Sequence, residues 1–294
     1  NDQNPENIRI NMTINDNKII FGHSPDADDA FMFYAMEKKY IEIPGYSIAH
    51  HMEDIESLNV LAATGKLPVT AISAARYPDV AQHYRIMSCG SSIGRNYGPM
   101  VVSVDPMTEA DLEGKRVAVP GRFTTSWLLF QIFGPKNCEP VFLDFDDVGS
   151  AVEEGRADVG ILLHEGQILY EKLGYHGIMS LGEKWHEATA LPIPLGVDLV
   201  SRHIGSELAQ TIADASLASI NYARAHEDDA LEYALGFGRG VDPEDGKKFV
   251  RMYVNEDTVD MGEEGREALN KLFGMAVERG ILKDMPELDI VQAN

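Results

Sequence analysis

The sequence has few cysteines, few basic residues and no long apolar run, and each shortage excludes a class of protein. Its 294 residues include two cysteines, Cys89 and Cys138, which are too few for a disulfide framework and form no C-x-x-C motif. We therefore expect reduced thiols and a cytoplasmic location. No stretch approaches the roughly 18 apolar residues of a membrane span. The polar first ten residues do not have the basic-then-apolar pattern of a signal peptide.

The charge balance excludes further partners. There are 25 Lys and Arg residues against 47 Asp and Glu, for a net charge of −22. Nucleic acids and anionic membranes both need a basic surface, so we expect neither as a partner. A small carboxylate substrate stays compatible with this net charge, because its binding depends on the charges that line the cleft and not on the total charge of the chain. Nothing in the sequence indicates an oligomeric state.

The pattern along the chain is typical of an α/β fold, because short apolar runs alternate with helical periodicity. Strands are predicted at residues 18–22, 69–73, 99–104, 116–120 and 158–163. Helices are predicted at residues 29–38, 54–64, 124–133, 146–154 and 165–173. After residue 201 the pattern becomes mostly helical, at residues 205–226, 228–235, 243–253 and 263–280.

Two segments, 54–73 and 144–163, align without a gap as a helix, a Gly followed by a basic residue, and a buried strand. Coincidence between two ordinary αβ units is one explanation; we favour two related lobes. Ligands of α/β sheets bind beyond the carboxyl ends of strands, where these segments place Ser73 and His164. With crossings at 99–106 and 194–202, we expect a discontinuous larger lobe (1–103 and 200–294) and a smaller lobe (104–199). This is the two-lobed, type 2 periplasmic-binding-protein-like architecture, with a central cleft and a helical C-terminal segment.

The first candidate motif is H-S-P-D-A-D-D-A-F, residues 23–31. Ala30 and Phe31 stand where a calcium loop needs a ligand and a glycine, so a metal loop is excluded. Acids are also favoured in a first helical turn. We expect Asp26 to cap the helix, and for Asp28 and Asp29 capping and ligand contact stay open. Ser24 is expected at the mouth of the cleft.

The second candidate is P-G-R-F-T-T-S, residues 120–126. A strand, a glycine turn and Thr124-Thr125 at the start of an apolar helix form a suitable anion cradle. An N-cap threonine in an ordinary loop is the alternative. We favour carboxylate binding. The segment is not a P-loop, because it does not end in G-K-[ST].

The third candidate is His164, which directly follows an apolar strand. An imidazole at the end of a strand can face a cleft and exchange a proton near neutral pH. The other histidines have no such placement, no spacing supports a zinc site, and no motif indicates a nucleophile. Tyr97 and Gly98 lie in a turn at the predicted hinge, where they are either structural or in contact with substrate.

Taken together, these stretches resemble the 1,4-dihydroxy-6-naphthoate synthase family of the futalosine pathway of menaquinone biosynthesis. The resemblance covers residues 19–205 and rests on the following segments: S-P-D-A-D-D-A-F, D-I-E-S-L-N, V-T-A-I-S, Y-G-P-M-V-V, P-G-R-F-T-T-S-W-L-L-F, H-E-G-Q-I-L-Y and L-G-E-K-W-H-E-A-T-A-L-P-I-P-L-G. Each segment alone is weak, and their combination is specific.

The resemblance implies a cofactor-free, metal-free lyase acting on cyclic dehypoxanthinyl futalosine, with His164 as the base that starts an elimination. The substrate-binding residues that we predict are Ser24, Asp28, Ser73, Tyr97, Gly98, Thr124 and Thr125. The chain departs from the family where Asp28 replaces an asparagine and Ala30 replaces a threonine. A non-catalytic solute-binding protein for an organic anion, or a paralogue such as chorismate dehydratase, is the alternative.

Overall fold

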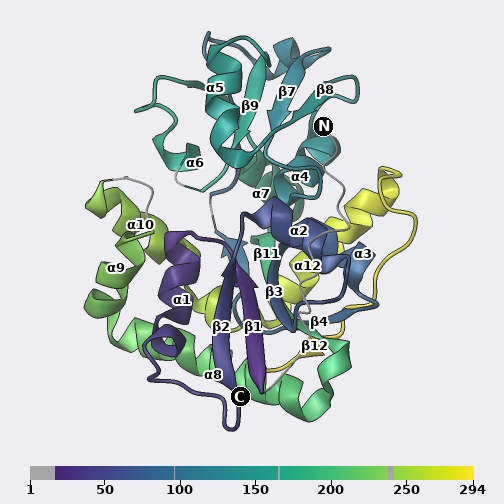
Figure 1. Ribbon diagram of the computed structural model, residues 1–294. Coiled ribbons are helices and arrows are strands. Elements are labelled where there is room, and N and C mark those ends of the chain that lie inside the picture. The colour runs from purple at the N-terminus through teal and green to yellow at the C-terminus, as the bar shows by residue number, and fades with distance from the viewer. Residues whose placement is uncertain (1–16, 96, 165, 238–241) are drawn as a thin grey trace, which may run out of the picture.

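The computed structural model describes residues 17–95, 97–164, 166–237 and 242–294, which form two lobes of mixed α/β structure (Figure 1). The strands are β1 (Lys18–His23), β2 (Ser47–Met52), β3 (Val69–Ser73), β4 (Tyr84–Met87), β5 (Ser92–Gly94), β6 (Met100–Ser103), β7 (Arg116–Val119), β8 (Glu139–Phe142), β9 (Val159–Leu162), β10 (His176–Ser180), β11 (Ile193–Ser201) and β12 (Ile290–Val291). The α-helices are α1 (Ala27–Glu37), α2 (Ile55–Ala62), α3 (Tyr77–Val80), α4 (Thr125–Phe133), α5 (Val148–Glu153), α6 (Gly166–Leu169), α7 (Leu181–Thr189), α8 (Ser206–Ala225), α9 (Glu227–Leu235), α10 (Pro243–Tyr253), α11 (Glu256–Val259) and α12 (Gly262–Glu278). Short 3₁₀ turns include η2 (Ala74–Arg76) and η4 (Phe145–Asp147).

Each lobe contains one sheet, and the two sheets repeat the same order. The larger sheet runs β12-β4-β11-β3-β1-β2, with β5 paired to β11, and the smaller runs β10-β6-β9-β7-β8. In the larger sheet β1 pairs in parallel with β2 and β3, and β3 pairs antiparallel with β11. In the smaller sheet β7 pairs in parallel with β8 and β9, and β9 pairs antiparallel with β6. The aligned segments 54–73 and 144–163 therefore end in the corresponding strands β3 and β9.

The apolar runs of the sequence explain where these strands lie. All four residues of β9 are buried, as are four of the five in β3, because helices cover both faces of the sheets. Helix α1 packs against α8, α9 and α10, so the C-terminal helices complete the core of the larger lobe. The carboxyl ends of β1 and β3 in one lobe thereby face those of β7 and β9 in the other (Figure 1).

The predicted two-lobed α/β fold with a helical C-terminal segment is confirmed, and β3 has the predicted bounds. The helix predicted at residues 165–173 is wrong in its extent, because α6 ends at Leu169 and turns follow to Gly174; residue 165 lies outside the described residues. The lobe boundaries at residues 103/104 and 199/200 stay a prediction. Strand β6 belongs to the smaller sheet, and β11 to the larger.

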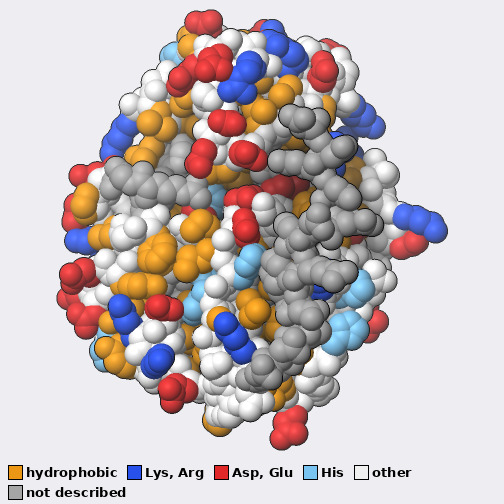
Figure 2. All heavy atoms as spheres, in the orientation of Figure 1, with side chains coloured by type: hydrophobic (Ala, Val, Ile, Leu, Met, Phe, Trp, Pro, Cys, Tyr) orange, Lys and Arg blue, Asp and Glu red, His pale blue; other side chains and the backbone are white. Residues whose placement is uncertain are grey.

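The surface agrees with the acidic composition. Figure 2 shows acidic side chains distributed over both lobes of the visible face. None of the helices in the described part of the chain has the length and apolar character needed to span a bilayer.

Candidate active site

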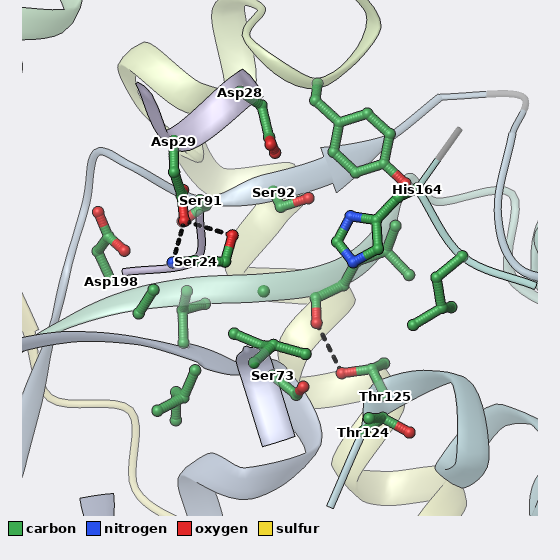
Figure 3. A pocket seen from close by; sticks show the side chains of 18 of the residues that line it. Ser24, Asp28, Asp29, Ser73, Ser91, Ser92, Thr124, Thr125, His164 and Asp198 are labelled. Atoms are coloured by element: carbon green, nitrogen blue, oxygen red, sulfur yellow. Dashed lines mark hydrogen bonds between the residues drawn. The ribbon is translucent and has the colours of Figure 1, made fainter. Parts of the chain in front are cut away.

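A cavity of about 110 Å³ lies where the strand ends of the two lobes meet. Its polar lining is contributed by both lobes and consists of Ser24, Asp28, Asp29, Ser73, Ser91, Ser92, Thr124, Thr125, Ser126, His164, Asp198 and Tyr253. Figure 3 shows Asp28, Asp29 and Asp198 toward one end of this cavity and the two threonines toward the other, with His164 at one side.

The start of α1 forms the acidic end. Asp26 occupies the N-cap position, but its side chain makes no capping hydrogen bond, so the predicted capping role of this carboxylate is wrong. Its Oδ2 instead lies 2.8 Å from the Ser24 hydroxyl and 3.5 Å from Nδ1 of His164. The Ser24 hydroxyl also lies 2.8 Å from Oδ2 of Asp29, which accepts a second hydrogen bond from the Ser24 N–H. Two acids of the motif, Asp28 and Asp29, thus line the cavity, and Asp26 contacts the lining residues Ser24 and His164.

These contacts affect the ionisation of Asp29. The Ser24 hydroxyl has a single proton, yet it contacts two carboxylates, so the second contact is favourable only when one acid carries a proton. Burial raises the pKa of Asp29 to about 6, against the opposing effect of the hydrogen bonds from Ser24, and the nearby Asp26 carboxylate adds to the rise. Asp29 consequently exchanges a proton not far below neutral pH.

His164 is held at the end of β9 by backbone and ring contacts. Its φ of +47° places it in the left-handed region, which is uncommon for a residue with a side chain. The rings of Phe145 and His164 pack edge to face, with their centroids 4.8 Å apart. The His164 side chain is 18% exposed. The Asp26 carboxylate lies beside Nδ1 at 3.5 Å without a hydrogen bond, and its negative charge favours a proton on Nδ1 over one on Nε2.

The Thr-Thr segment forms the other end, although its hydroxyls are used within the protein. The Thr124 hydroxyl donates to the Gly121 carbonyl over 3.0 Å and accepts from the Trp127 N–H as the N-cap of α4. The Thr125 hydroxyl donates to the Leu195 carbonyl over 2.7 Å and accepts from the Ala75 N–H. The backbone N–H groups of residues 125 and 126 donate to no described residue. They are the donors that α4 offers to an anion.

A carboxylate of the larger lobe already fills part of the expected cradle. Glu56 of α2 accepts hydrogen bonds from the N–H groups of Arg122 (2.7 Å) and Phe123 (3.1 Å) in the smaller lobe. Gly121 makes this approach feasible, because its φ is +120° and a Cβ atom there would lie 2.5 Å from the Glu56 carboxylate. The Arg76 guanidinium also stacks on the Phe123 ring at 3.7 Å. Together these contacts link the lobes beside the cavity.

Replacing Glu56 by alanine is expected to weaken this link and raise KM by about three- to tenfold, since it removes two hydrogen bonds to a charged acceptor. Small-angle X-ray scattering of the ligand-free variant should show a larger radius of gyration. Glu56→Gln keeps an oxygen acceptor and should have the smaller effect, and Glu53→Ala, at an exposed site of the same region, is the control. An unchanged radius and KM in Glu56→Ala would contradict the role of this contact.

Ser73 at the end of β3 is oriented by Asn59. The Asn59 amide donates to the Ser73 hydroxyl oxygen over 3.0 Å and accepts from the Ser73 N–H over 2.9 Å. Asn59 therefore leaves the hydroxyl proton of Ser73 unused, and Ser73 lines the cavity.

The structure groups six of the eight predicted site residues around this cavity: Ser24, Asp28, Ser73, Thr124, Thr125 and His164. Tyr97 and Gly98 lie outside it. The Tyr97 hydroxyl donates to the Met252 carbonyl over 2.8 Å, and a Cβ on Gly98 would lie 2.7 Å from Gly182, so both residues pack closely against neighbouring backbone. Contact of either residue with substrate stays a prediction.

Sequence reasoning missed Ser91, Ser92 and Asp198. The small polar run S-C-G-S-S after β4 was a signal for the first two, and an aspartate inside the apolar crossing strand was a signal for the third.

The polar groups in the cavity limit what it can bind. None of the described residues that line it is a lysine or an arginine. The described residues also include no group of three His, Cys, Asp or Glu side chains arranged to hold a metal ion. A carboxylate in the cavity would thus be bound by N–H and hydroxyl groups and not by a lysine or an arginine of the described lining.

Comparisons with known proteins identify the family of this chain. The model of a family described as menaquinone biosynthesis matches residues 19–278. A 1,4-dihydroxy-6-naphthoate synthase from Thermus thermophilus is 36% identical over 265 residues, which are 90% of this chain and 96% of that protein. A crystal structure of a protein from Archaeoglobus fulgidus aligns with a TM-score of 0.86 and 42% identity, over 90% of this chain and 99% of the other.

More distant structures share the fold alone. The ligand-binding component of an ABC-type import system from Staphylococcus aureus aligns with a TM-score of 0.69 at 13% identity, over 94% of this chain and 96% of the other. The periplasmic-binding-protein-like fold is thus common to proteins of different function. By the match over residues 19–278 and the identity to the Thermus protein, the chain belongs to the menaquinone biosynthesis family.

Proposed function

We propose that this protein is a 1,4-dihydroxy-6-naphthoate synthase, a lyase that converts cyclic dehypoxanthinyl futalosine to 1,4-dihydroxy-6-naphthoate by base-initiated elimination. The observation that carries the proposal is the position of His164, which lines a cavity between two lobes in a chain 36% identical to a protein of that name. A partly buried imidazole next to a carboxylate is suited to remove a proton from carbon.

In this proposal each end of the cavity has its own task. The N–H groups at the start of α4 and the Ser73 hydroxyl bind the substrate carboxylate, because they are neutral donors directed at one place. Nε2 of His164 takes the proton from a carbon next to a carbonyl group. The electron pair moves toward that carbonyl, and its return expels the sugar-derived ring, which leaves with the electrons of the broken bond. Contacts between the lobes, such as that of Glu56, exclude water from the carbanion.

Asp28 replaces the family's asparagine without placing a charge at the carboxylate end, since Figure 3 shows it among the aspartates at the other end. This position supports retention of the same acidic substrate. We further propose a cytoplasmic location, in keeping with the two free cysteines, Cys89 and Cys138.

The test is to incubate the purified protein with cyclic dehypoxanthinyl futalosine and to follow the naphthoate product by chromatography and mass spectrometry. Chorismate serves as the comparison substrate. Turnover of the futalosine derivative alone supports the proposal. Turnover of chorismate would indicate the dehydratase, and tight binding without any turnover would indicate a solute-binding protein.

A further inference from the structure

Asp198 is a buried acid in the cavity that the proposed reaction does not yet use. It lies in β11, paired with Ala71 of β3, and it is 3% exposed. Its carboxyl lines the cavity and makes no hydrogen bond to any described residue. The loop after β4 passes so close that a Cβ on Gly90 would lie 2.2 Å from Oδ2 of Asp198, and Gly90 has a φ of +82°. The backbone is thus shaped around this carboxyl group.

The surroundings favour the neutral form of Asp198. A buried carboxylate is costly without a cation or several donors, and the described cavity lining contains neither lysine nor arginine. Burial raises the pKa of Asp198 well above the usual range of aspartate, and the nearby Asp29 carboxylate adds to the rise. Asp29, with a pKa of about 6, is ionised at pH 7. A neutral acid and a carboxylate therefore lie next to each other (Figure 3).

This pair offers both a donor and an acceptor to a ligand. Both hydrogen bonds that Asp29 accepts from described residues reach its Oδ2, which leaves Oδ1 for another donor. The proton of a neutral Asp198 needs an acceptor that the described protein does not supply. The hydroxyl of Ser91 is also buried, lines the same cavity and has no hydrogen-bond partner among the described residues. A group that both donates and accepts, such as a hydroxyl, satisfies these three side chains.

We propose that Asp198 is a neutral carboxylic acid that donates a hydrogen bond to a hydroxyl group of the substrate, which in turn donates to Asp29. This inference rests on the proposed function, and it fixes the orientation of the substrate. The sugar-derived, hydroxyl-bearing ring lies among Asp29, Ser91 and Asp198, and the carboxylate lies at the start of α4. An anion is repelled from the acidic end, so the two ends of the cavity select the two ends of the substrate.

Steady-state kinetics of two substitutions test this assignment. Asp198→Ala removes the donor and should raise KM for cyclic dehypoxanthinyl futalosine about tenfold, with kcat within about threefold of wild type. Asp198→Asn retains a donor and an acceptor and should keep KM within about threefold. Affinity for the naphthoate product, which has lost the sugar-derived ring, should be nearly unchanged in both. Asp228→Ala, at an exposed site of α9, is the control.

A purely structural Asp198 would lower stability and weaken substrate and product binding alike, and that result would overturn the proposal. Infrared spectroscopy decides the protonation state without any substrate. The band of a protonated carboxyl group should be present at pH 7 in wild type and absent from Asp198→Asn. If wild type and Asp198→Asn have identical spectra in the region of the protonated carboxyl band, the proposal is also overturned. If the wild-type protein shows the carboxyl band but does not turn over cyclic dehypoxanthinyl futalosine, the proposed function is wrong and the assignment of a neutral Asp198 is still supported.

Discussion

Replacing His164 by alanine is expected to lower kcat by about 10²- to 10⁴-fold, which is the usual contribution of a positioned general base. The imidazole lines the cavity between the lobes, and Asp26 lies 3.5 Å from its Nδ1. Folding should persist, because the ring packs on the edge of the cavity and is 18% exposed. KM should change little, since the carboxylate and the hydroxyl groups of the substrate are bound by other residues. The measurement is steady-state kinetics together with circular dichroism.

The matched control is His176→Ala, because His176 is an exposed histidine in β10 of the same lobe. It should retain wild-type kcat. Asp26→Asn should lower kcat less than His164→Ala, because the Asp26 substitution keeps the imidazole of His164 and changes only its orientation. Full activity in His164→Ala would show that His164 is not the general base.

Replacing Asp29 by asparagine is expected to stabilise the fold at pH 7 while it lowers kcat about tenfold. Burial raises the pKa of Asp29 from 3.8 to about 6. Between these values the folded state binds more protons than the unfolded state, so stability falls as the pH rises from about 4 to 6. At pH 7 the ionised Asp29 therefore costs about 1 to 3 kcal/mol of stability. Activity falls because the charge interacts favourably with His164.

Chemical denaturation at several pH values measures this effect. The difference in unfolding free energy between Asp29→Asn and wild type should be largest above pH 6 and should shrink as the pH falls through 6 toward 4. An asparagine oxygen still accepts from the Ser24 N–H, so the loop should keep its shape. A variant that is no more stable than wild type above pH 6 would contradict the predicted cost of the charge.

Local signals in the sequence predicted much of the fold. Apolar runs bounded by turn residues located β3 and β9, and the gapless alignment of residues 54–73 with 144–163 indicated two related lobes, whose sheets the structure shows. The position of His164 followed, because the side chain after a buried strand lies at the edge of a sheet. The start of α4 was predicted from Thr124, whose hydroxyl caps the helix.

Contacts between distant segments could not be predicted in this way. Nothing near Glu56 indicates that its carboxylate binds the N–H groups of residues 122 and 123 in the other lobe. Asp198 faces the cavity because β11 returns antiparallel beside β3, which is a property of the long-range pairing. The capping prediction for Asp26 failed because Ser24 and His164 compete for the same carboxylate.

The most direct test of the central claim is a crystal structure of His164→Asn soaked with cyclic dehypoxanthinyl futalosine. We predict that the substrate carboxylate lies on the N–H groups of residues 125 and 126, and the sugar-derived hydroxyls beside Asp29 and Asp198. The carbon that loses its proton should then lie within contact distance of residue 164. A substrate bound in the reverse orientation, or with that carbon far from residue 164, would contradict the account.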